Sequence, residues 1–155
     1  MAWDSREKTS RSAEELSLDE SLKKHHLNTI SNFGETWNNH AINTMKRQTM
    51  SRILHYSELY KEIIGIPGVI MEFGVLWGAT LSQLINLRGM YEPYNYTRHI
   101  YGFDTFEGFI GVDQSKDGQE LNNGIFSVTP FYEDQLEELL LLHEKNNPLA
   151  HKKKF

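Results

Sequence analysis

The chain has 155 residues, of which 39% are hydrophobic and 24% are charged, so its size and composition suit one domain with a buried core. Its net charge of −5 argues against a general nucleic-acid binder, and the absence of cysteine excludes disulfides, thiolate catalysis and thiolate metal sites. The first residues lack the apolar core of a signal peptide, and no apolar run approaches the ~20 residues that span a bilayer. We therefore expect a cytoplasmic protein with no membrane partner.

Residues 1–39 form a polar stretch of mixed charge with only a thin apolar stripe of leucines. Two capping-box patterns occur in it, one of Ser12 with Glu15 and one of Ser17 with Glu20, and each favours the start of a helix. The sequence predicts a loosely ordered, partly helical N-terminal extension. Its role stays open between a solvated tail, a lid and a contact between copies of a homo-oligomer.

Apolar residues at helical spacing begin near residue 39 and continue to residue 64. Gly65 and Pro67 end the pattern, because glycine suits the end of a helix and proline cannot continue one. The sequence thus predicts one long helix over residues 39–64, which opens a second domain, residues 40–155.

Two short apolar runs, residues 69–73 and residues 100–103, are typical of parallel strands covered on both faces. Residues 80–87 have helical spacing, whereas residues 88–98 contain Gly89 and Pro93 and are predicted to be a loop. This order predicts a βαβ unit, and hence an α/β fold with a Rossmann-like parallel sheet flanked by helices.

After the second strand, residues 108–127 are polar and glycine-bearing, which favours a long surface loop. Thr129 and Pro130 predict the start of a further helix that ends near residue 147 and buries the leucines at positions 136 and 139–142. Residues 151–155 resemble the approach to another strand. Because a two-stranded sheet is marginal, we expect residues 40–155 to be an incomplete domain, the front part of a longer one.

Each predicted strand ends near a carboxylate, Glu72 in the first and Asp104 after the second, and the carboxyl ends of parallel strands lie side by side. Asp104 can accept hydrogen bonds from a ribose diol, each worth roughly 1.5–3 kcal/mol with a charged acceptor. Gly74 permits a tight turn, and Gly78 lets a ligand or a neighbouring element approach the main chain. The start of the following helix favours an anion such as a carboxylate.

The spacing of these residues separates two ligand classes. A dinucleotide fingerprint reads G-x-G-x-x-G directly after the strand, but here Leu76 stands where the middle glycine would be. An acid at the strand end, as at Glu72, repels a pyrophosphate and tolerates an ammonium or sulfonium group. The pattern therefore favours S-adenosylmethionine over NAD, with an NAD-type Rossmann oxidoreductase as the less favoured alternative. A purely structural Glu72 that caps the helix also stays open.

Three segments carry a family resemblance: residues 71–78 (MEFGVLWG), residues 91–98 (YEPYNYTR) and residues 102–109 (GFDTFEGF). Together they closely resemble the macrocin-type sugar O-methyltransferases, which are class I S-adenosylmethionine enzymes of antibiotic and surface-polysaccharide pathways. The resemblance runs from about Arg47 to Pro148. It implies methyl transfer to the hydroxyl of a sugar or sugar nucleotide, with no nucleic acid as partner.

The resemblance also implies roles for individual residues. Glu72, Gly74 and Gly78 would line the methionine part of the cofactor site. Asp104 would hold the ribose, with Thr105 and Phe106 beside the adenosine. The family's catalytic base and the ligands of its Mg²⁺ ion lie later than this chain, so neither a catalytic nor a metal-binding residue is assigned. An inactive cofactor-binding or interaction module is therefore the alternative to a working enzyme.

Two other patterns point to metals but lack the decisive residues. The seven histidines are scattered, without a paired i, i+4 motif. Residues 113–118 imitate the start of a calcium loop, but Gly124 stands where the bidentate glutamate would be. We expect no metal site in either place.

Overall fold

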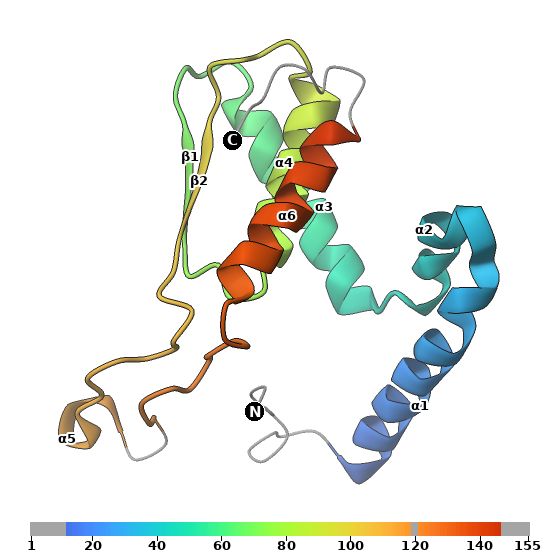
Figure 1. Cartoon of the computed structure of the whole chain (residues 1–155), viewed down its shortest axis with the longest axis vertical. Coiled ribbons are helices and arrows are strands. Elements are labelled where there is room, and N and C mark those ends of the chain that lie inside the picture. Colours follow the sequence, from blue (N-terminus) through green and yellow to red (C-terminus); the bar gives the residue numbers. More distant parts are fainter. Residues whose placement is uncertain (1–11, 119–120, 147–155) are drawn as a thin grey trace. The chain divides into compact units, whose positions relative to one another are not determined.

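A computed structural model describes residues 12–118 and 121–146 of the chain (Figure 1). The described residues divide into two compact units, one of residues 12–54 and one of residues 55–118 and 121–146, and the predicted domain boundary near residue 39 stays a prediction. No helix in the described part of the chain is long and apolar enough to cross a membrane. The predicted strand approach at residues 151–155 lies outside the described residues.

The described part of the N-terminal unit is mostly helical. Its longest element, α1 (Ala13–Thr29), begins with the predicted capping box: the Ser12 hydroxyl accepts from the Glu15 N–H at 3.2 Å, and the Glu15 carboxylate accepts from the Ser12 N–H at 2.7 Å. Ser17 lies inside α1, so the second capping-box pattern starts no helix. Short turns follow: η2 (Ile30–Thr36), α2 (Trp37–His40) and η3 (Ala41–Thr44).

The predicted helix over residues 39–64 is wrong in its first part. The chain leaves η3 through Met45, whose extended backbone (φ −69°, ψ 126°) interrupts any continuous helix. The helix α3 (Arg47–Ile63) begins after this break and ends just before Gly65, as predicted. The apolar residues therefore keep helical spacing across a break in the helix, and neither proline nor glycine marks this break in the sequence.

The C-terminal unit contains the predicted βαβ unit. The strands β1 (Ile70–Phe73) and β2 (Ile100–Phe103) are parallel and pair Ile70 with Ile100 and Phe73 with Phe103. The connecting helix α4 (Ala79–Tyr91) is longer than predicted, since residues 88–91 are helical rather than loop. Its last turn is partly buried, because Arg88 is fully enclosed and Tyr91 packs on the core, whereas Met90 is 69% exposed.

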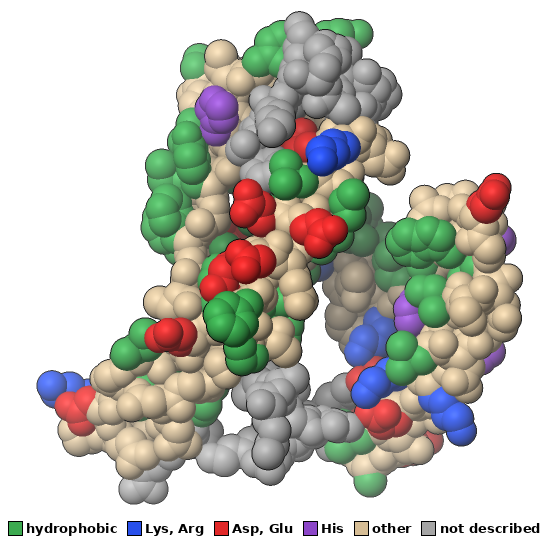
Figure 2. Space-filling view, in the orientation of Figure 1, with side chains coloured by type: hydrophobic (Ala, Val, Ile, Leu, Met, Phe, Trp, Pro, Cys, Tyr) green, Lys and Arg blue, Asp and Glu red, His purple; other side chains and the backbone are tan. Residues whose placement is uncertain are grey.

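One face of this sheet carries the core, and within the described residues the other face is open (Figures 1 and 2). Met71 and Tyr101 are 54% and 44% exposed, and Phe73 and Phe103 are 74% and 47% exposed. The expectation that both faces are covered is therefore wrong for the described residues. Ile70 and Ile100 face the helices instead.

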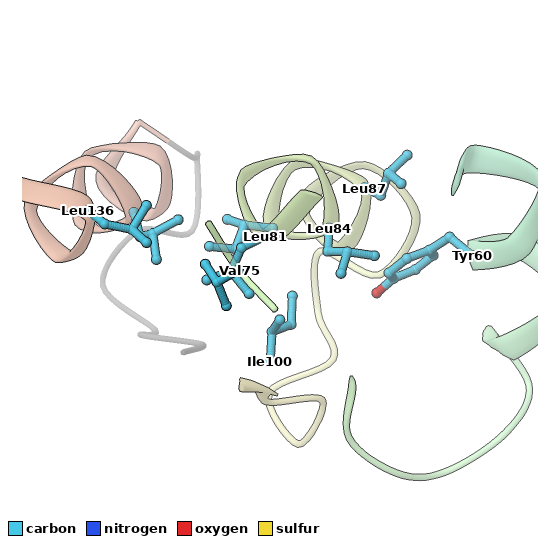
Figure 3. Close-up of a cluster of buried hydrophobic side chains, with 9 residues drawn as sticks. Tyr60, Val75, Leu81, Leu84, Leu87, Ile100 and Leu136 are labelled. Atoms are coloured by element: carbon cyan, nitrogen blue, oxygen red, sulfur yellow. The ribbon is translucent and has the colours of Figure 1, made fainter. Parts of the chain in front are cut away.

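The core lies between α3, α4, β2 and α6 (Tyr132–Lys145) (Figure 3). It consists of Tyr60, Val75, Leu81, Leu84, Ile85, Leu87, Ile100, Leu136 and Leu140. The helix α6 begins two residues later than predicted, because Phe131 takes a left-handed backbone (φ 61°) as its N-cap. Of its leucines, Leu136 and Leu140 are buried at i, i+4 spacing, whereas Leu139 and Leu142 are 40% and 56% exposed.

A buried network joins the end of α4 to the end of α3. Glu92 accepts from the Tyr60 hydroxyl at 2.7 Å and pairs with the guanidinium of Arg98. The same guanidinium donates to the carbonyls of Ile63 and Ile66 at 2.9 and 3.0 Å, just beyond α3. Hydrogen bonds from Arg98, Tyr60 and Asn95 outweigh burial and hold the pKa of Glu92 below its usual value.

A second buried ion pair, Arg88 with Glu144, joins α4 to α6. Arg88 also donates to the carbonyl of Arg98 at 3.2 Å, and burial lowers the pKa of its guanidinium to about 10. Both ion pairs involve this crossover, because Glu92 and Arg98 lie in the loop of residues 92–99 and Arg88 donates to the Arg98 carbonyl.

Candidate functional site

The carboxyl ends of β1 and β2 open into turns that face the same edge of the sheet. Gly74 continues the ladder beyond β1, because its N–H donates to the carbonyl of Phe103 at 2.9 Å. It has a positive φ of 85°, which glycine adopts at little cost. Asp104 follows β2 directly, so its side chain emerges beside the turn that begins at Gly74.

The carboxylate of Asp104 accepts hydrogen bonds from both turns. Its Oδ2 accepts from the backbone N–H of Leu76 at 2.8 Å, and its Oδ1 accepts from the N–H of Phe106 at 2.7 Å. Leu76 and Phe106 both have positive φ, 53° and 58°, which is unfavourable for residues other than glycine. Backbone strain of this kind gathers at functional sites when the surroundings enforce it. A carboxylate has about four acceptor positions, so two remain for a ligand.

A cavity of about 640 Å³ lies against this carboxylate. That volume is within the range of small-molecule sites. Its polar side chains are Asp104 and Thr105, and the rest of its lining is apolar or glycine: Gly74, Leu76, Phe103, Gly108, Phe109, Ile110 and Phe126. A largely apolar cavity with one carboxylate in its lining fits a nucleoside, whose ribose diol donates hydrogen bonds while its base needs apolar contact.

The outer wall of the cavity is a pair of backbone segments within the predicted loop. Phe109 donates its N–H to the carbonyl of Ile125 at 3.0 Å and accepts from the N–H of Gly124 at 2.9 Å. Its ring meets that of Phe126 edge-on, with centroids 5.5 Å apart. Gly108 is required here, because a Cβ would lie 2.3 Å from the Ile125 carbonyl oxygen. At the far end of this loop is the short helix α5 (Gln114–Asp117).

Sequence reasoning did not identify Phe109, Ile110 and Phe126 as site residues. They stand in a polar, glycine-bearing loop, so the large apolar residues among the glycines were the available signal. Their convergence on Asp104 depends on backbone pairing across the loop, which no local pattern reveals.

The predicted site residues lie in four places. Gly74, Asp104 and Thr105 line the cavity together. Phe106 is half-buried instead, packed on the core and 6.5 Å from the ring of Tyr132. Gly78 is buried at the N-cap of α4 (φ 73°), where a Cβ would lie 2.3 Å from Leu136 Cδ1. The neighbour that approaches Gly78 is thus α6.

Glu72 lines a separate cavity of about 280 Å³ on the helix side of the sheet. This second cavity is bounded by α3, β1 and α4 and includes Tyr56, Ile63 and Thr80. The two strand-end acids therefore face different cavities, since Glu72 points to the covered side and Asp104 emerges at the sheet edge.

The polar side chains that line the cavity fit a nucleoside better than a metal ion. Within residues 12–118 and 121–146, no group of three or more His, Cys, Asp or Glu side chains could hold a metal ion. Asp113 and Asp117 of the calcium-like pattern serve α5, because Asp113 accepts from Ser115 and donates its N–H to Asp117 at 2.9 Å. The Ser115 hydroxyl and N–H hold the pKa of Asp113 below its usual value.

Two solved structures of the methyltransferase CalS11 are similar to this chain. The first, described as a calicheamicin methyltransferase, is 34% identical with a TM-score of 0.77, and the match covers 99% of this chain and 60% of CalS11. The second, described as apo TDP-rhamnose 3'-O-methyltransferase, is 32% identical with a TM-score of 0.71 and covers 98% and 57%. No protein-family model and no curated protein matches the chain.

These likenesses confirm both the predicted resemblance to sugar O-methyltransferases and the predicted fold class. The chain spans about 60% of the length of CalS11. Its parallel strands and flanking helices correspond to the front part of a Rossmann-like methyltransferase fold.

Proposed function

We propose that this chain, a relative of the sugar O-methyltransferases over the front part of their fold, binds S-adenosylmethionine at the cavity beside Asp104. The observation that carries the proposal is the cavity itself: it is largely apolar, its lining includes the Asp104 carboxylate, and it lies at the carboxyl edge of a parallel sheet. Ligands of Rossmann-like folds bind at this edge.

Within the cavity, Asp104 would accept from the two ribose hydroxyls, and its orientation is already fixed by the Leu76 and Phe106 amides. Phe109, Ile110 and Phe126 would cover the base. Gly74 leaves room for the chain that joins the ribose to the sulfonium. Glu72 and Gly78 remain candidates for the methionine end, at the α4 side of the β1 turn.

The bound cofactor would supply an electrophilic methyl group for in-line displacement by a hydroxyl oxygen. The residues of this chain would contribute by holding the nucleoside in one orientation, which lowers the barrier through positioning. No residue of the chain is proposed as the base that removes the hydroxyl proton.

For the acceptor we propose the hydroxyl of a deoxysugar, carried on a nucleotide. CalS11 is described as acting on TDP-rhamnose, and this chain matches it over 99% of its own length. The remaining alternative is a cofactor-binding module without transferase activity, because the match leaves 40% of CalS11 without a counterpart in this chain.

Calorimetric titration of the chain with S-adenosylhomocysteine, and separately with NAD, tests the proposal. We expect saturable binding of S-adenosylhomocysteine, little binding of NAD, and loss of binding in Asp104→Ala. Absence of binding by a chain that is folded by circular dichroism would refute the cofactor site. A second assay with labelled S-adenosylmethionine and TDP-rhamnose separates the enzyme from the module, since the module binds but transfers nothing.

A further inference from the structure

We propose that a cavity within the N-terminal unit, here called the α1 cavity, binds a neutral sugar through its hydroxyl groups. The α1 cavity measures about 430 Å³, which is within the range of small-molecule sites. All of its lining residues lie between Asp19 and Thr49, so it belongs to the N-terminal unit alone. It shares no lining residue with the cavity beside Asp104.

One face of α1 forms the first wall of the α1 cavity. Its residues follow the i, i+3, i+4, i+7 spacing of neighbours on one side of a helix: Asp19, Leu22, Lys23 and His26. At ~1.5 Å per residue, the wall extends about 10 Å along the helix axis from Asp19 to His26. This length accommodates a ligand of the size of a monosaccharide.

The opposite wall is the segment that joins η3 to α3. Two side-chain contacts connect this segment to α1, one near each end of the helical face. Lys46 forms an ion pair with Asp19 at 2.7 Å, and Nδ1 of His26 lies 2.5 Å from the hydroxyl oxygen of Thr44. The α1 cavity is therefore a hollow between two walls that polar contacts hold together.

The contact between His26 and Thr44 fixes the tautomer of the histidine. The Thr44 hydroxyl donates its one proton to the carbonyl of Ala41 at 3.2 Å, so it accepts from Nδ1 of His26. In the neutral ring Nε2 then carries no proton and is an acceptor. His26 thus brings to the α1 cavity an acceptor for the hydroxyl of a ligand.

The lysines and acids that line the α1 cavity are paired with one another. Lys46 contacts Asp19, and the ammonium nitrogen of Lys23 lies 3.6 Å from a carboxylate oxygen of Glu20. Two lysines and two acids leave no net charge, so the cavity has no excess of positive charge to attract a phosphate group. In the part of the chain that the structure describes, no group of three or more His, Cys, Asp or Glu side chains could hold a metal ion. The charges therefore favour a neutral ligand.

A sugar matches the remaining chemistry of the α1 cavity. Lys46 is a donor, and Asp19 and His26 are acceptors, so the site suits a ligand whose groups both donate and accept hydrogen bonds. Hydroxyl groups do both. Leu22 and Met45 are half-buried in the lining and offer apolar contact to the C–H surface of a pyranose ring. Because none of residues 12–54 is buried, such a ligand would also cover apolar surface that this unit leaves accessible.

Titration with methyl α-glucopyranoside and with glucose 1-phosphate, followed by ligand-observed NMR, tests the proposal, because the two sugars differ in charge. We expect the unmodified chain to bind the neutral sugar saturably and at least as tightly as the phosphorylated one. His26→Phe keeps an aromatic ring but removes both ring nitrogens, so the affinity for the neutral sugar should fall about tenfold. His25→Phe is the matched control and should leave this affinity unchanged, because His25 is exposed and does not line the cavity.

A second variant tests the charge balance with little change in shape. Asp19→Asn removes the acid that pairs with Lys46, so the α1 cavity gains a net positive charge. The affinity for glucose 1-phosphate should then rise about two- to fivefold relative to that for methyl α-glucopyranoside, as expected for one exposed charge pair. The gain should shrink as the salt concentration is raised.

Three results would overturn the proposal. The first is no saturable binding of the neutral sugar, or tighter binding of glucose 1-phosphate, by an unmodified chain that is folded by circular dichroism. The second is equal affinity of His26→Phe and His25→Phe, which would place the bound sugar outside the α1 cavity. The third, which decides the matter if His26→Phe loses its helical circular dichroism, is an unchanged preference between the two sugars in Asp19→Asn. Binding of S-adenosylhomocysteine by the same chain reports separately on the cofactor site.

Discussion

Asp104 holds the backbone of two turns in place without any ligand. Its two oxygens accept from Leu76 and Phe106, two residues of positive φ in the turns that follow β1 and β2. An asparagine at this position keeps one acceptor oxygen and replaces the other with a donor, so one of the two N–H groups loses its partner. We expect Asp104→Asn to lower the free energy of unfolding by about 1–2 kcal/mol. Urea denaturation of the unliganded chain measures this.

The control for this substitution is Glu107→Gln, which removes the same charge from an exposed side chain three residues away. An exposed change of this kind should cost within ~0.5 kcal/mol. Equal stability of Asp104→Asn and Glu107→Gln would mean that the carboxylate serves a ligand alone and does not hold the turns.

Three glycines of similar backbone conformation allow strain and packing to be separated. Gly111, Gly78 and Gly108 have φ of 72°, 73° and 75°. A Cβ on Gly111 would meet nothing within 4 Å, one on Gly78 would meet the flexible end of Leu136, and one on Gly108 would meet the backbone oxygen of Ile125. Substitution by alanine should therefore cost about 1, 2 and 3 or more kcal/mol respectively.

Thermal and urea unfolding of the three variants measure the order of these stability costs directly. Gly111→Ala serves as the internal control, because its cost contains the backbone term alone. If Gly78→Ala were no more costly than Gly111→Ala, Leu136 would have moved aside, and the close packing of α6 on the start of α4 would not be rigid.

At the scale of elements, two buried ion pairs hold the contacts of α4 with α3 and with α6. Glu92 has its pKa held below the usual value, so the folded state binds fewer protons than the unfolded state near pH 4. The stabilisation is therefore complete above the unfolded pKa, near 4.5, and is lost as the pH falls through the folded value. Unfolding experiments between pH 7 and pH 3 should show this acid loss of stability.

Glu92→Gln should reduce the loss of stability between pH 7 and pH 3. It should also lower the stability at pH 7, because it leaves Arg98 buried without its counter-charge. Glu137→Gln, on the exposed side of α6, is the control and should keep the profile of the unmodified chain. A profile that keeps its full acid limb in Glu92→Gln would assign the pH dependence to another carboxylate.

The pair Arg88–Glu144 offers a double-mutant test. Arg88→Met should destabilise the chain by about 3–5 kcal/mol, since Glu144 stays buried without a charge partner. Adding Glu144→Met should recover part of the lost stability, because two apolar side chains then meet between α4 and α6. If the double variant were as unstable as the sum of the single ones, the two residues would not interact energetically.

These elements also show what the sequence could and could not predict. The βαβ unit, the end of α3 at Gly65 and the capping box of Ser12 follow from local patterns, and all three are confirmed. The length of α4 was missed, because Gly89 and Pro93 indicated a loop, whereas Arg88 in the last turn of α4 is paired with Glu144 of α6, 56 residues later. An ion pair across the fold outweighs the local loop signal in this case.

The candidate site likewise has a part that the sequence predicts and a part that it does not. Asp104 and Gly74 lie next to one cavity because parallel strands bring their ends together, which the pattern alone predicts. The separation of Glu72 from Asp104 depends on which face of β1 the helices cover. Strand alternation leaves that choice open until tertiary packing is known.

At the scale of the whole molecule, burial is concentrated in the C-terminal unit. None of residues 12–54 is buried, whereas α3, α4, β2 and α6 enclose a core on one side of the sheet. The other side of that sheet presents the stacked rings of Phe73 and Phe103, with centroids 5.0 Å apart, flanked by Met71 and Tyr101. Contiguous exposed apolar surface of this kind favours association with another surface.

We therefore expect this chain to self-associate through the open sheet face as its concentration rises. Phe73→Ser should weaken the association measured by sedimentation velocity, because Phe73 is 74% exposed and stacks on Phe103 on this face. Its effect on the free energy of unfolding should stay within about 1 kcal/mol, since little buried contact is lost. Leu142→Ser, at a residue 56% exposed on α6, is the matched control and should leave association unchanged. Equal association of both variants and the unmodified chain would contradict a role of the sheet face and direct attention to the exposed apolar residues of the N-terminal helices.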